Sequence, residues 1–250
     1  MSEFVVCTES DGVLEIELNR RDKRNALDAA MYAAVTDAFI RAAGTESVRV
    51  VLLRGQADMF CAGNDLSEFL DPDGPGTRPA LALMDAVNAL SKPIIAAVGG
   101  VAVGLGTTLL YHCDVVYATP QARFGMPFVA LGVCPEFGAT MLAPQYGGYL
   151  RSAEAMLFGE PFDVGTAREL GLVTRIVEAD ELIAYAGKRA RKLAALPPGA
   201  VTATRKLMRL HGRPAGMEVV FRTELAAFDT MLRGPEAMGA INAFLGRAGK

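Results

Sequence analysis

The sequence predicts an α/β fold with largely parallel strands, followed by an all-helical C-terminal region. In the middle of the chain, apolar strand segments alternate with glycine turns and helical segments, which is typical of such folds. The 250 residues, 51% of them hydrophobic, are enough to bury one large core. After Pro197 and Pro198 only helical patterns follow. We therefore expect residues 1–196 to form the core domain and residues 197–250 a separate helical layer.

The N-terminal part is expected to contain a β-hairpin, a helix and a third strand. The segments FVVCTE and GVLEIELN are rich in strand-forming residues and meet at a Ser-Asp-Gly turn, which predicts a hairpin. Asp28 is expected to cap a helix that ends near Gly44. The segments after it are expected to be the strand SVRVVLLRG, the turn ADMFCAGNDLSEF leading into a helical segment, and a loop over residues 71–79.

The central part is expected to contain two further strands and several capped helices. A helix over residues 80–90 precedes the strand PIIAAV, and a glycine turn, a helix through Leu110 and the strand CDVVYAT come next. Further on, we expect LVTRIVE to be a strand. Ser152, Asp163 and Asp180 are expected to be the N-caps of three helices, because short polar side chains can accept hydrogen bonds from the first free N–H groups of a helix.

The composition argues against nucleic acids and metal ions as ligands. The net charge is −3, and no basic block could follow a phosphate backbone. Four scattered cysteines and two histidines form no motif of zinc-ligand spacing. We expect free thiols in a reducing compartment.

The sequence also argues against membrane insertion and secretion. Residues 93–110 are uncharged, but four glycines and an initial proline favour a strand, a turn and a short helix over a spanning helix. The first ten residues lack the basic and apolar regions of a secretory signal. A cytoplasmic location is the expectation.

Two glycine-rich turns, FCAGNDL and GGVAVGLGTTL, each follow a strand and precede a helix. A helix N-terminus carries free N–H groups and the positive end of the helix dipole, so each turn could bind negative charge. A dinucleotide-binding motif is a poor interpretation of the second turn, because Leu109 stands at the position of its third glycine. Taken singly, each turn is an ordinary strand-to-helix connection.

Taken together, the motifs resemble the crotonase, or enoyl-CoA hydratase/isomerase, superfamily along nearly the whole chain. The resemblance rests on KRNALD, VVLLRGQADMFCAGNDLSEF, KPIIAAVGGVAVGLGTTLLYHCDVVYATPQARFGMPF and ELGLVTRIV. It implies a core spiral of ββα units and a helical C-terminal region that builds homotrimers or dimers of trimers. It also implies an acyl-CoA thioester substrate and no metal or redox cofactor, since coenzyme A is part of the substrate.

The resemblance also implies where the chemistry takes place. In the family a thioester carbonyl is bound by two main-chain N–H groups, which correspond here to Asn64 and Leu105. The positions of the two hydratase glutamates are occupied by Thr108 and Phe128. Glu136 stands where Δ3,Δ2-enoyl-CoA isomerases carry their single catalytic glutamate. The implied reaction is isomerisation of 3-enoyl-CoA to 2-enoyl-CoA, with hydration and non-catalytic acyl-CoA binding as alternatives.

Glu136 is the one ionisable residue in PFVALGVCPEFGAT. Without the resemblance, the simpler interpretation is an acid favoured by the N-terminus of the following helix, GATMLAPQYG. With it, the catalytic role is preferred. The apolar neighbours should raise the pKa of Glu136 by desolvation, toward the range useful for a base near neutral pH.

The residues implied to bind coenzyme A lie around KRNA and AGND. For Lys23 and Arg24 a solvated surface pair is the alternative, and Asp65 is expected to cap the segment that follows it. His112 is expected to lie in the core or an interface and not to be catalytic. The implied coenzyme A residues are Lys23, Arg24, Ala26, Ala62, Asp65 and Leu66.

Overall fold

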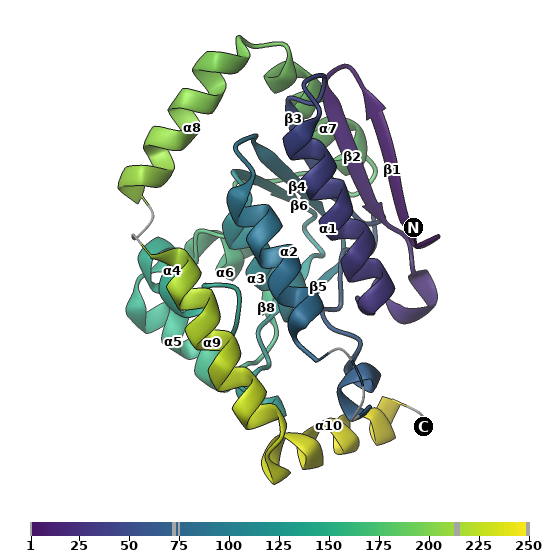
Figure 1. Cartoon of the computed structure of the whole chain (residues 1–250), viewed down its shortest axis with the longest axis vertical. Coiled ribbons are helices and arrows are strands. Elements are labelled where there is room, and N and C mark those ends of the chain that lie inside the picture. The colour runs from purple at the N-terminus through teal and green to yellow at the C-terminus, as the bar shows by residue number, and fades with distance from the viewer. Residues whose placement is uncertain (1, 72–73, 75, 213–215, 249–250) are drawn as a thin grey trace.

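The main element of the fold is a six-stranded sheet (Figure 1). The computed structural model describes residues 2–71, 74, 76–212 and 216–248. The strand order is β1-β2-β3-β4-β6-β9, and all neighbours are parallel except β1 and β2. The strands are β1 (Val5–Ser10), β2 (Val13–Leu18), β3 (Val50–Arg54), β4 (Ile94–Val98), β6 (Val115–Ala118) and β9 (Arg175–Ile176).

The predicted hairpin is confirmed. β1 and β2 pair antiparallel, and Ser10 lies opposite Val13. Asp11 and Gly12 between them have φ values of 51° and 77°. A two-residue hairpin turn with both residues in the left-handed region matches the twist of the strands, and Asp-Gly is among the dipeptides that adopt it most readily.

Helices cover both faces of the sheet. Alternate strand residues point to opposite sides, and in β3 apolar residues point to both sides. Val51 and Leu53 of β3 join the core cluster with α1 (Ala29–Gly44) and α2 (Arg78–Ala89), which lie side by side in Figure 1. Val50 and Leu52 join a second cluster with α7 (Leu182–Ala194). The sheet is therefore buried on both faces, as expected for parallel strands.

A second, three-stranded sheet was not predicted from the sequence. It contains β5 (Val101–Val103), β7 (Arg123–Gly125) and β8 (Phe162–Asp163) in the order β5-β7-β8. Strands of two or three residues are too short to show a two-residue period. β5 lies inside what the sequence indicates only as a glycine turn.

The segment of residues 93–110 is divided between elements, as predicted. It contains β4, β5, α3 (Leu105–Thr108) and the start of the 3-10 helix η3 (Leu109–His112). Among the helices of the described residues, none is long and apolar enough to cross a membrane. The remaining helices before the C-terminal region are η1 (Arg21–Lys23), η2 (Leu66–Leu70), η4 (Val129–Leu131), α4 (Ala139–Gly147), α5 (Tyr149–Phe158) and α6 (Val164–Glu169).

Of the helix caps predicted at Asp28, Ser152, Asp163 and Asp180, two are confirmed. Asp28 accepts a hydrogen bond from the Met31 N–H at 2.8 Å, and Asp163 accepts one from the Thr166 N–H at 2.9 Å. The strand predicted over LVTRIVE is present only as the two residues of β9.

The other two caps, Ser152 and Asp180, are wrong. Ser152 is buried inside α5, which begins earlier because Gly148, with φ 82°, separates it from α4. The prediction for Asp180 fails because residues 178–181 form a turn, closed by the Glu181 N–H bonding to the Glu178 carbonyl at 3.0 Å. α7 begins only after that turn and has no side-chain cap.

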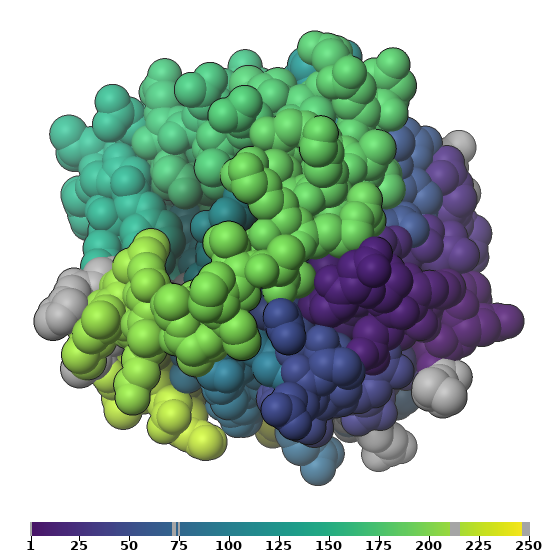
Figure 2. All heavy atoms as spheres, turned by 90° about the horizontal axis from the view of Figure 1, so that it is seen from above, coloured from purple at the N-terminus to yellow at the C-terminus, as the bar shows by residue number. Residues whose placement is uncertain are grey.

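The C-terminal region is helical throughout its described residues, as predicted. It contains α8 (Pro198–Gly212), α9 (Met217–Leu232) and α10 (Pro235–Ala248). α8 runs along one edge of the molecule in Figure 1, and its Arg205 donates hydrogen bonds to Asp114 at 2.7 Å and to the Leu90 carbonyl at 2.6 Å. Figure 2 shows the green C-terminal part of the chain beside the purple N-terminal residues. α9 packs against α2, and α10 packs against η2 and η4. The division at residues 196 and 197 falls between α7 and α8, and its status as a domain boundary stays a prediction.

We predict that Asp28→Ala destabilises the fold, because α1 loses its N-cap and Arg20 loses an ion-pair partner at 3.4 Å. The expected loss in free energy of unfolding is about 1 kcal/mol, measured by urea denaturation. Asp37→Ala, at an exposed position inside the same helix, is the matched control. Equal stability of the two variants would contradict the capping role.

Candidate active site

Glu136 lies in a pocket between α1, η2, the start of α2 and α9. Only 2% of its surface is exposed. Its Oε1 accepts a hydrogen bond from the Thr108 hydroxyl at 2.9 Å, and its Oε2 has no hydrogen-bond partner among the described residues. The pocket is lined by Leu27, Tyr32, Asn64, Asp65, Glu68, Phe69, Gly76, Thr77, Pro79, Ala80, Glu136, Leu225 and Phe228.

The environment of Glu136 favours its protonated form. The pKa of the carboxyl is raised to about 8: burial is the largest cause, the Thr108 hydroxyl acts in the opposite direction, and the nearby Glu224 carboxyl adds to the rise. Desolvation disfavours the charged form because the pocket wall replaces water around it. A carboxyl with this pKa can release and accept a proton near neutral pH.

A different acid occupies the N-terminus of the helix that follows Glu136. α4 begins at Ala139, and Glu224 of α9 accepts hydrogen bonds from the N–H groups of Gly138 at 2.6 Å and Thr140 at 3.1 Å. The interpretation of Glu136 as the acid of this helix N-terminus is therefore wrong. Its carboxylate instead faces Thr108 and the pocket.

The two glycine turns pack against each other through their main chains. The Cys61 N–H donates to the Val101 carbonyl at 3.0 Å, and the Val103 N–H donates to the Cys61 carbonyl at 2.9 Å. Gly106 approaches so closely that a Cβ there would lie 2.4 Å from the Cys61 carbonyl oxygen. Only glycine permits this contact without displacing the backbone.

The main-chain N–H groups of Asn64 and Leu105 lie in these packed turns. Each follows a glycine in the left-handed region, Gly63 with φ 88° and Gly104 with φ 56°. A Cβ on Gly63 would lie 3.5 Å from the Leu105 nitrogen. Within the described part of the chain, neither N–H donates a hydrogen bond to the protein. Both thus lack a protein acceptor, as an oxyanion-binding site requires. Asn64 lines the pocket, whereas Leu105 is fully buried and lies outside the described pocket lining.

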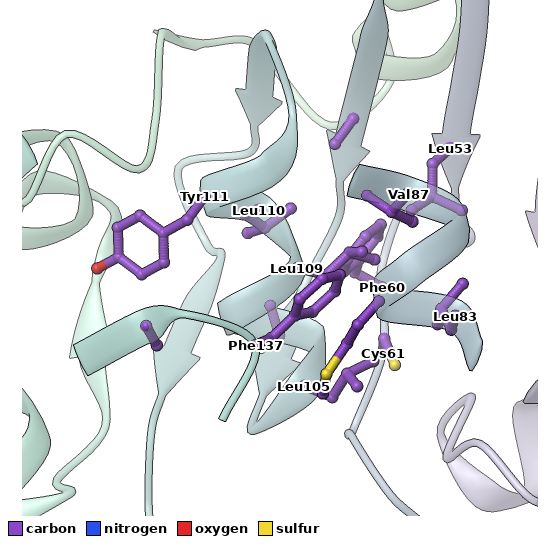
Figure 3. Close-up of a cluster of buried hydrophobic side chains, with 14 of the residues drawn as sticks. Leu53, Phe60, Cys61, Leu83, Val87, Leu105, Leu109, Leu110, Tyr111 and Phe137 are labelled. Atoms are coloured by element: carbon purple, nitrogen blue, oxygen red, sulfur yellow. The ribbon is translucent and has the colours of Figure 1, made fainter. Parts of the chain in front are cut away.

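Buried side chains fix the segments that carry the site. Figure 3 shows Cys61, Leu105 and Phe137 in one apolar cluster, and all three are almost fully buried. They come from the first turn, the second turn and the position after Glu136. Dense packing of this kind resists small displacements of the backbone.

Tyr32 of α1 belongs to the site, although sequence reasoning did not single it out. Its hydroxyl donates to the side-chain Oδ1 of Asn64, and its ring lines the pocket. Burial raises the pKa of Tyr32 well above its ordinary value, and the Glu136 charge raises it further. The phenol therefore stays protonated as a donor. A tyrosine on the inner face of a helix gives no separate signal in the sequence, because that position is equally typical of a core residue.

The predicted coenzyme A residues lie on two adjoining segments. The Ala62 N–H donates to the Arg24 carbonyl at 3.0 Å, and the Leu27 N–H donates to the Gly63 carbonyl at 2.8 Å. Their binding role stays a prediction. Lys23 and Arg24 are exposed, while Ala26, Ala62, Asp65 and Leu66 are half-buried.

Asp65 has a structural role that the sequence predicts. Its carboxylate accepts from the Ser67 N–H at 3.2 Å, which confirms the cap of η2, and it pairs with Arg20 at 2.9 Å. Its hydrogen bonds to Ser67 and Arg20 outweigh its burial and lower its pKa.

His112 lies in the core, as expected. It is fully buried, its Nε2 is 2.7 Å from the Phe137 carbonyl oxygen, and its ring stacks on Phe137 at 4.1 Å. Over the described residues, no group of three His, Cys, Asp or Glu side chains is placed to hold a metal ion.

The chain is similar to known proteins along most of its length. The model of the family described as enoyl-CoA hydratase/isomerase matches residues 8–246. The 2,3-dehydroadipyl-CoA hydratase of Escherichia coli K12 is 33% identical over 249 residues, which cover 98% of this chain and 96% of the relative. Human enoyl-CoA delta isomerase 2 is 31% identical over 99% of this chain and 64% of its own length.

Solved structures agree with the fold. OdaA of Pseudomonas aeruginosa superposes with a TM-score of 0.92 at 38% identity, covering 97% of this chain and 99% of OdaA. An enoyl-CoA hydratase/isomerase of Pseudoalteromonas atlantica T6c gives 0.92 at 34% identity and covers 98% of both chains. The predicted crotonase-type fold with a helical C-terminal region is confirmed.

We predict that Glu136→Gln stabilises the protein in a pH-dependent way. The folded-state pKa of about 8 lies above the ordinary 4.5, so folded protein keeps a proton that the unfolded chain releases between these pH values. Stability contributed by this group therefore falls as pH rises from 4.5 to 8. The variant should gain free energy of unfolding on the order of a few kcal/mol at pH 8 and little near pH 4.5.

Thermal unfolding at both pH values measures this difference. Glu218→Gln, at an exposed position of α9, is the control and should track the wild type. A variant no more stable than wild type at pH 8 would show that Glu136 is not held in its neutral form by burial.

Proposed function

This chain belongs to the enoyl-CoA hydratase/isomerase family, and on that premise we propose that it isomerises 3-enoyl-CoA thioesters to 2-enoyl-CoA. The observation that carries the proposal is the state of Glu136. It is a buried carboxyl with a raised pKa, and one oxygen has no protein partner in the described part of the chain. Isomerisation within an acyl-CoA needs one such group.

In the proposed mechanism, ionised Glu136 removes a proton from C2 of the bound 3-enoyl thioester. The N–H groups of Asn64 and Leu105 hold the thioester oxygen as negative charge develops on it in the dienolate. Loss of one such donor elsewhere typically raises a barrier by about 2.7–4 kcal/mol. The carboxyl then returns the proton to C4 on the same face. Coenzyme A takes part only as a portion of the substrate.

The other two acids of the pocket are less suited to proton transfer. Asp65 is paired with Arg20 and bonded to Ser67. Both oxygens of Glu68 lie 3.0 Å from the Ala29 N–H at the start of α1. Both side chains are thus engaged by donors of the protein, which hold them against α1, Arg20 and Ser67. Over the described residues, Oε2 of Glu136 has no comparable partner.

Hydration of 2-enoyl-CoA is the second candidate function. The similarity to 2,3-dehydroadipyl-CoA hydratase favours it, and Glu68 in the same pocket offers a second carboxylate. Against it, the family's two hydratase positions are held by Thr108 and Phe128. A hydratase needs groups that both position water and transfer its protons, so we rank isomerisation first. A non-catalytic acyl-CoA-binding member is the remaining alternative.

We predict that purified protein generates the conjugated thioester absorbance from 3-hexenoyl-CoA and removes little of it from 2-hexenoyl-CoA. Glu136→Gln should lower kcat by roughly 10²–10⁴-fold, because a positioned acid–base group supplies about that factor, while acyl-CoA binding persists. Since only the ionised base acts, kcat/KM should rise with pH through about 8 and then level.

The substrate pair separates the candidates. Loss of conjugation from 2-hexenoyl-CoA as the dominant activity would assign a hydratase, and binding without turnover of either substrate would assign a binding protein. Full activity of Glu136→Gln would refute the role of this residue.

We further propose that the chain assembles as a homotrimer or a dimer of trimers. Large apolar side chains are exposed on helices of the central and C-terminal regions, and packing them against another copy of the chain would remove apolar surface from water. α5 and α8 carry most of them: Tyr149, Leu150, Leu157, Phe158, Leu207, Met208 and Leu210, each more than half exposed.

We predict that the double variant Met208→Lys with Leu210→Lys shifts the solution mass toward the monomer, because two charges would have to be buried in the interface. Light scattering coupled to size-exclusion chromatography measures the mass. Ile40→Lys places a charge at a similarly exposed apolar position on α1 and should leave the mass unchanged. A wild-type protein that elutes as a monomer would contradict the assembly.

A further inference from the structure

Glu224 is a buried acid that the proposed mechanism does not use. It lies on α9 and is 6% exposed. Its carboxylate accepts hydrogen bonds from the Gly138 N–H at 2.6 Å, the Thr140 N–H at 3.1 Å and the Thr140 hydroxyl at 2.5 Å. These donors belong to the start of α4, within four residues of Glu136. The carboxylate thus joins the C-terminal region to the segment that carries the base.

The segment held by Glu224 has an unusual backbone. Phe137 and Gly138 have φ values of 61° and 71°, so two consecutive residues adopt the left-handed region, and Phe137 does so with a bulky side chain. Such a conformation persists only where its surroundings fix it. Here the fixing contacts are the stacking of Phe137 on His112, the hydrogen bond between them, and the Glu224 carboxylate on Gly138.

The packing around Gly138 connects the same two regions. A Cβ at Gly138 would lie 2.7 Å from the Met217 sulfur and 3.0 Å from the Phe221 ring, and both residues are on α9. A shift of α9 would therefore move the turn that follows Glu136. The direction in which the Glu136 carboxyl points depends on this turn.

We propose that Glu224 is a positioning residue for Glu136: its carboxylate holds the turn that aims the base into the pocket and presents a second negative charge to it. The inference rests on the proposed function, in which Glu136 moves the proton. According to this inference, α9 of the C-terminal region not only packs against the core but also positions the catalytic base.

The negative charge of Glu224 affects the pKa of Glu136. Glu224 raises the pKa of Glu136, after burial as the largest cause. Burial raises the pKa of Glu224 itself, and the hydrogen bonds from Thr140 and Gly138 oppose this rise without cancelling it. The other titratable groups that face Glu136 are Tyr32, Cys134, Asp65 and Glu68, and the described pocket lining contains no Lys, Arg or His. Removing the Glu224 charge should therefore lower the pKa of Glu136.

The test is Glu224→Gln, with Glu218→Gln on the exposed face of the same helix as matched control. The Glu136 carboxyl is titrated directly by carbon-13 NMR, and kcat and KM for 3-hexenoyl-CoA are measured against pH. In Glu224→Gln the Glu136 titration and the rising limb of kcat/KM should both move to lower pH. We expect kcat to fall by roughly tenfold or more, because small displacements of a catalytic group are costly, with KM nearly unchanged. Glu218→Gln should match the wild type.

A role confined to capping α4 would give a different result. A folded Glu224→Gln variant that has a lower melting temperature but the same Glu136 titration and kcat would overturn the proposal. Should this variant fail to fold, Thr140→Val removes one hydrogen bond and leaves the carboxylate in place. It is expected to lower kcat by roughly fivefold, the equivalent of one ordinary hydrogen bond, and an unchanged kcat would overturn the proposal.

The titration separates this inference from the isomerase assignment. It is read from the Glu136 carboxyl without substrate, so it tests the coupling to Glu224 even if wild-type protein does not convert 3-hexenoyl-CoA. Failure of turnover in wild type refutes the proposed function. An unshifted Glu136 titration in Glu224→Gln refutes the role of Glu224.

Discussion

The burial of one carboxyl, that of Glu136, is the constraint on which the rest of the site depends. A carboxylate removed from water is unstable unless it is paired, and the one donor to this carboxyl among the described residues is neutral, the Thr108 hydroxyl. Because the charged form is disfavoured by burial, the Glu136 carboxyl keeps its proton up to a pH of about 8. The site thus combines a proton acceptor of useful strength with an apolar pocket. Burying an ionisable group in an apolar pocket destabilises the fold locally. The densely packed apolar cluster around Phe137 and Leu105 holds the site in place.

The two main-chain donors of Asn64 and Leu105 come together because of the topology of the sheet. β3 and β4 are adjacent and parallel, so the turns after their carboxyl ends emerge at the same edge. The pairing of Cys61 with β5 then holds the two turns together, and glycines at the contact allow the backbones to touch. Asn64 and Leu105 thereby present free N–H groups from segments about forty residues apart in the chain. The C-terminal region completes the arrangement, because Leu225 and Phe228 of α9 line the pocket and Glu224 bonds to the segment after Glu136.

The long periodic elements could be predicted from the sequence, whereas short ones and tertiary contacts could not. The hairpin, α1, α2 and β4 follow from residue patterns that span five or more positions. β5 and β7 are too short to show a period, and the start of α5 is set by Gly148, not by the better capping residue Ser152. Glu136 stood out by its isolation, but its role came from the resemblance. Glu224 and Tyr32 gave no signal, since Glu224 meets Gly138 across 86 residues of sequence.

The most direct test of the account is the path of the proton. If one buried carboxyl takes the proton from C2 and returns it to C4, then 3-hexenoyl-CoA deuterated at C2 and converted in ordinary water should yield 2-hexenoyl-CoA that retains deuterium at C4. Mass spectrometry and proton NMR of the product measure this retention. Product whose C4 hydrogen comes entirely from the solvent would contradict a single-carboxyl transfer inside a closed apolar pocket.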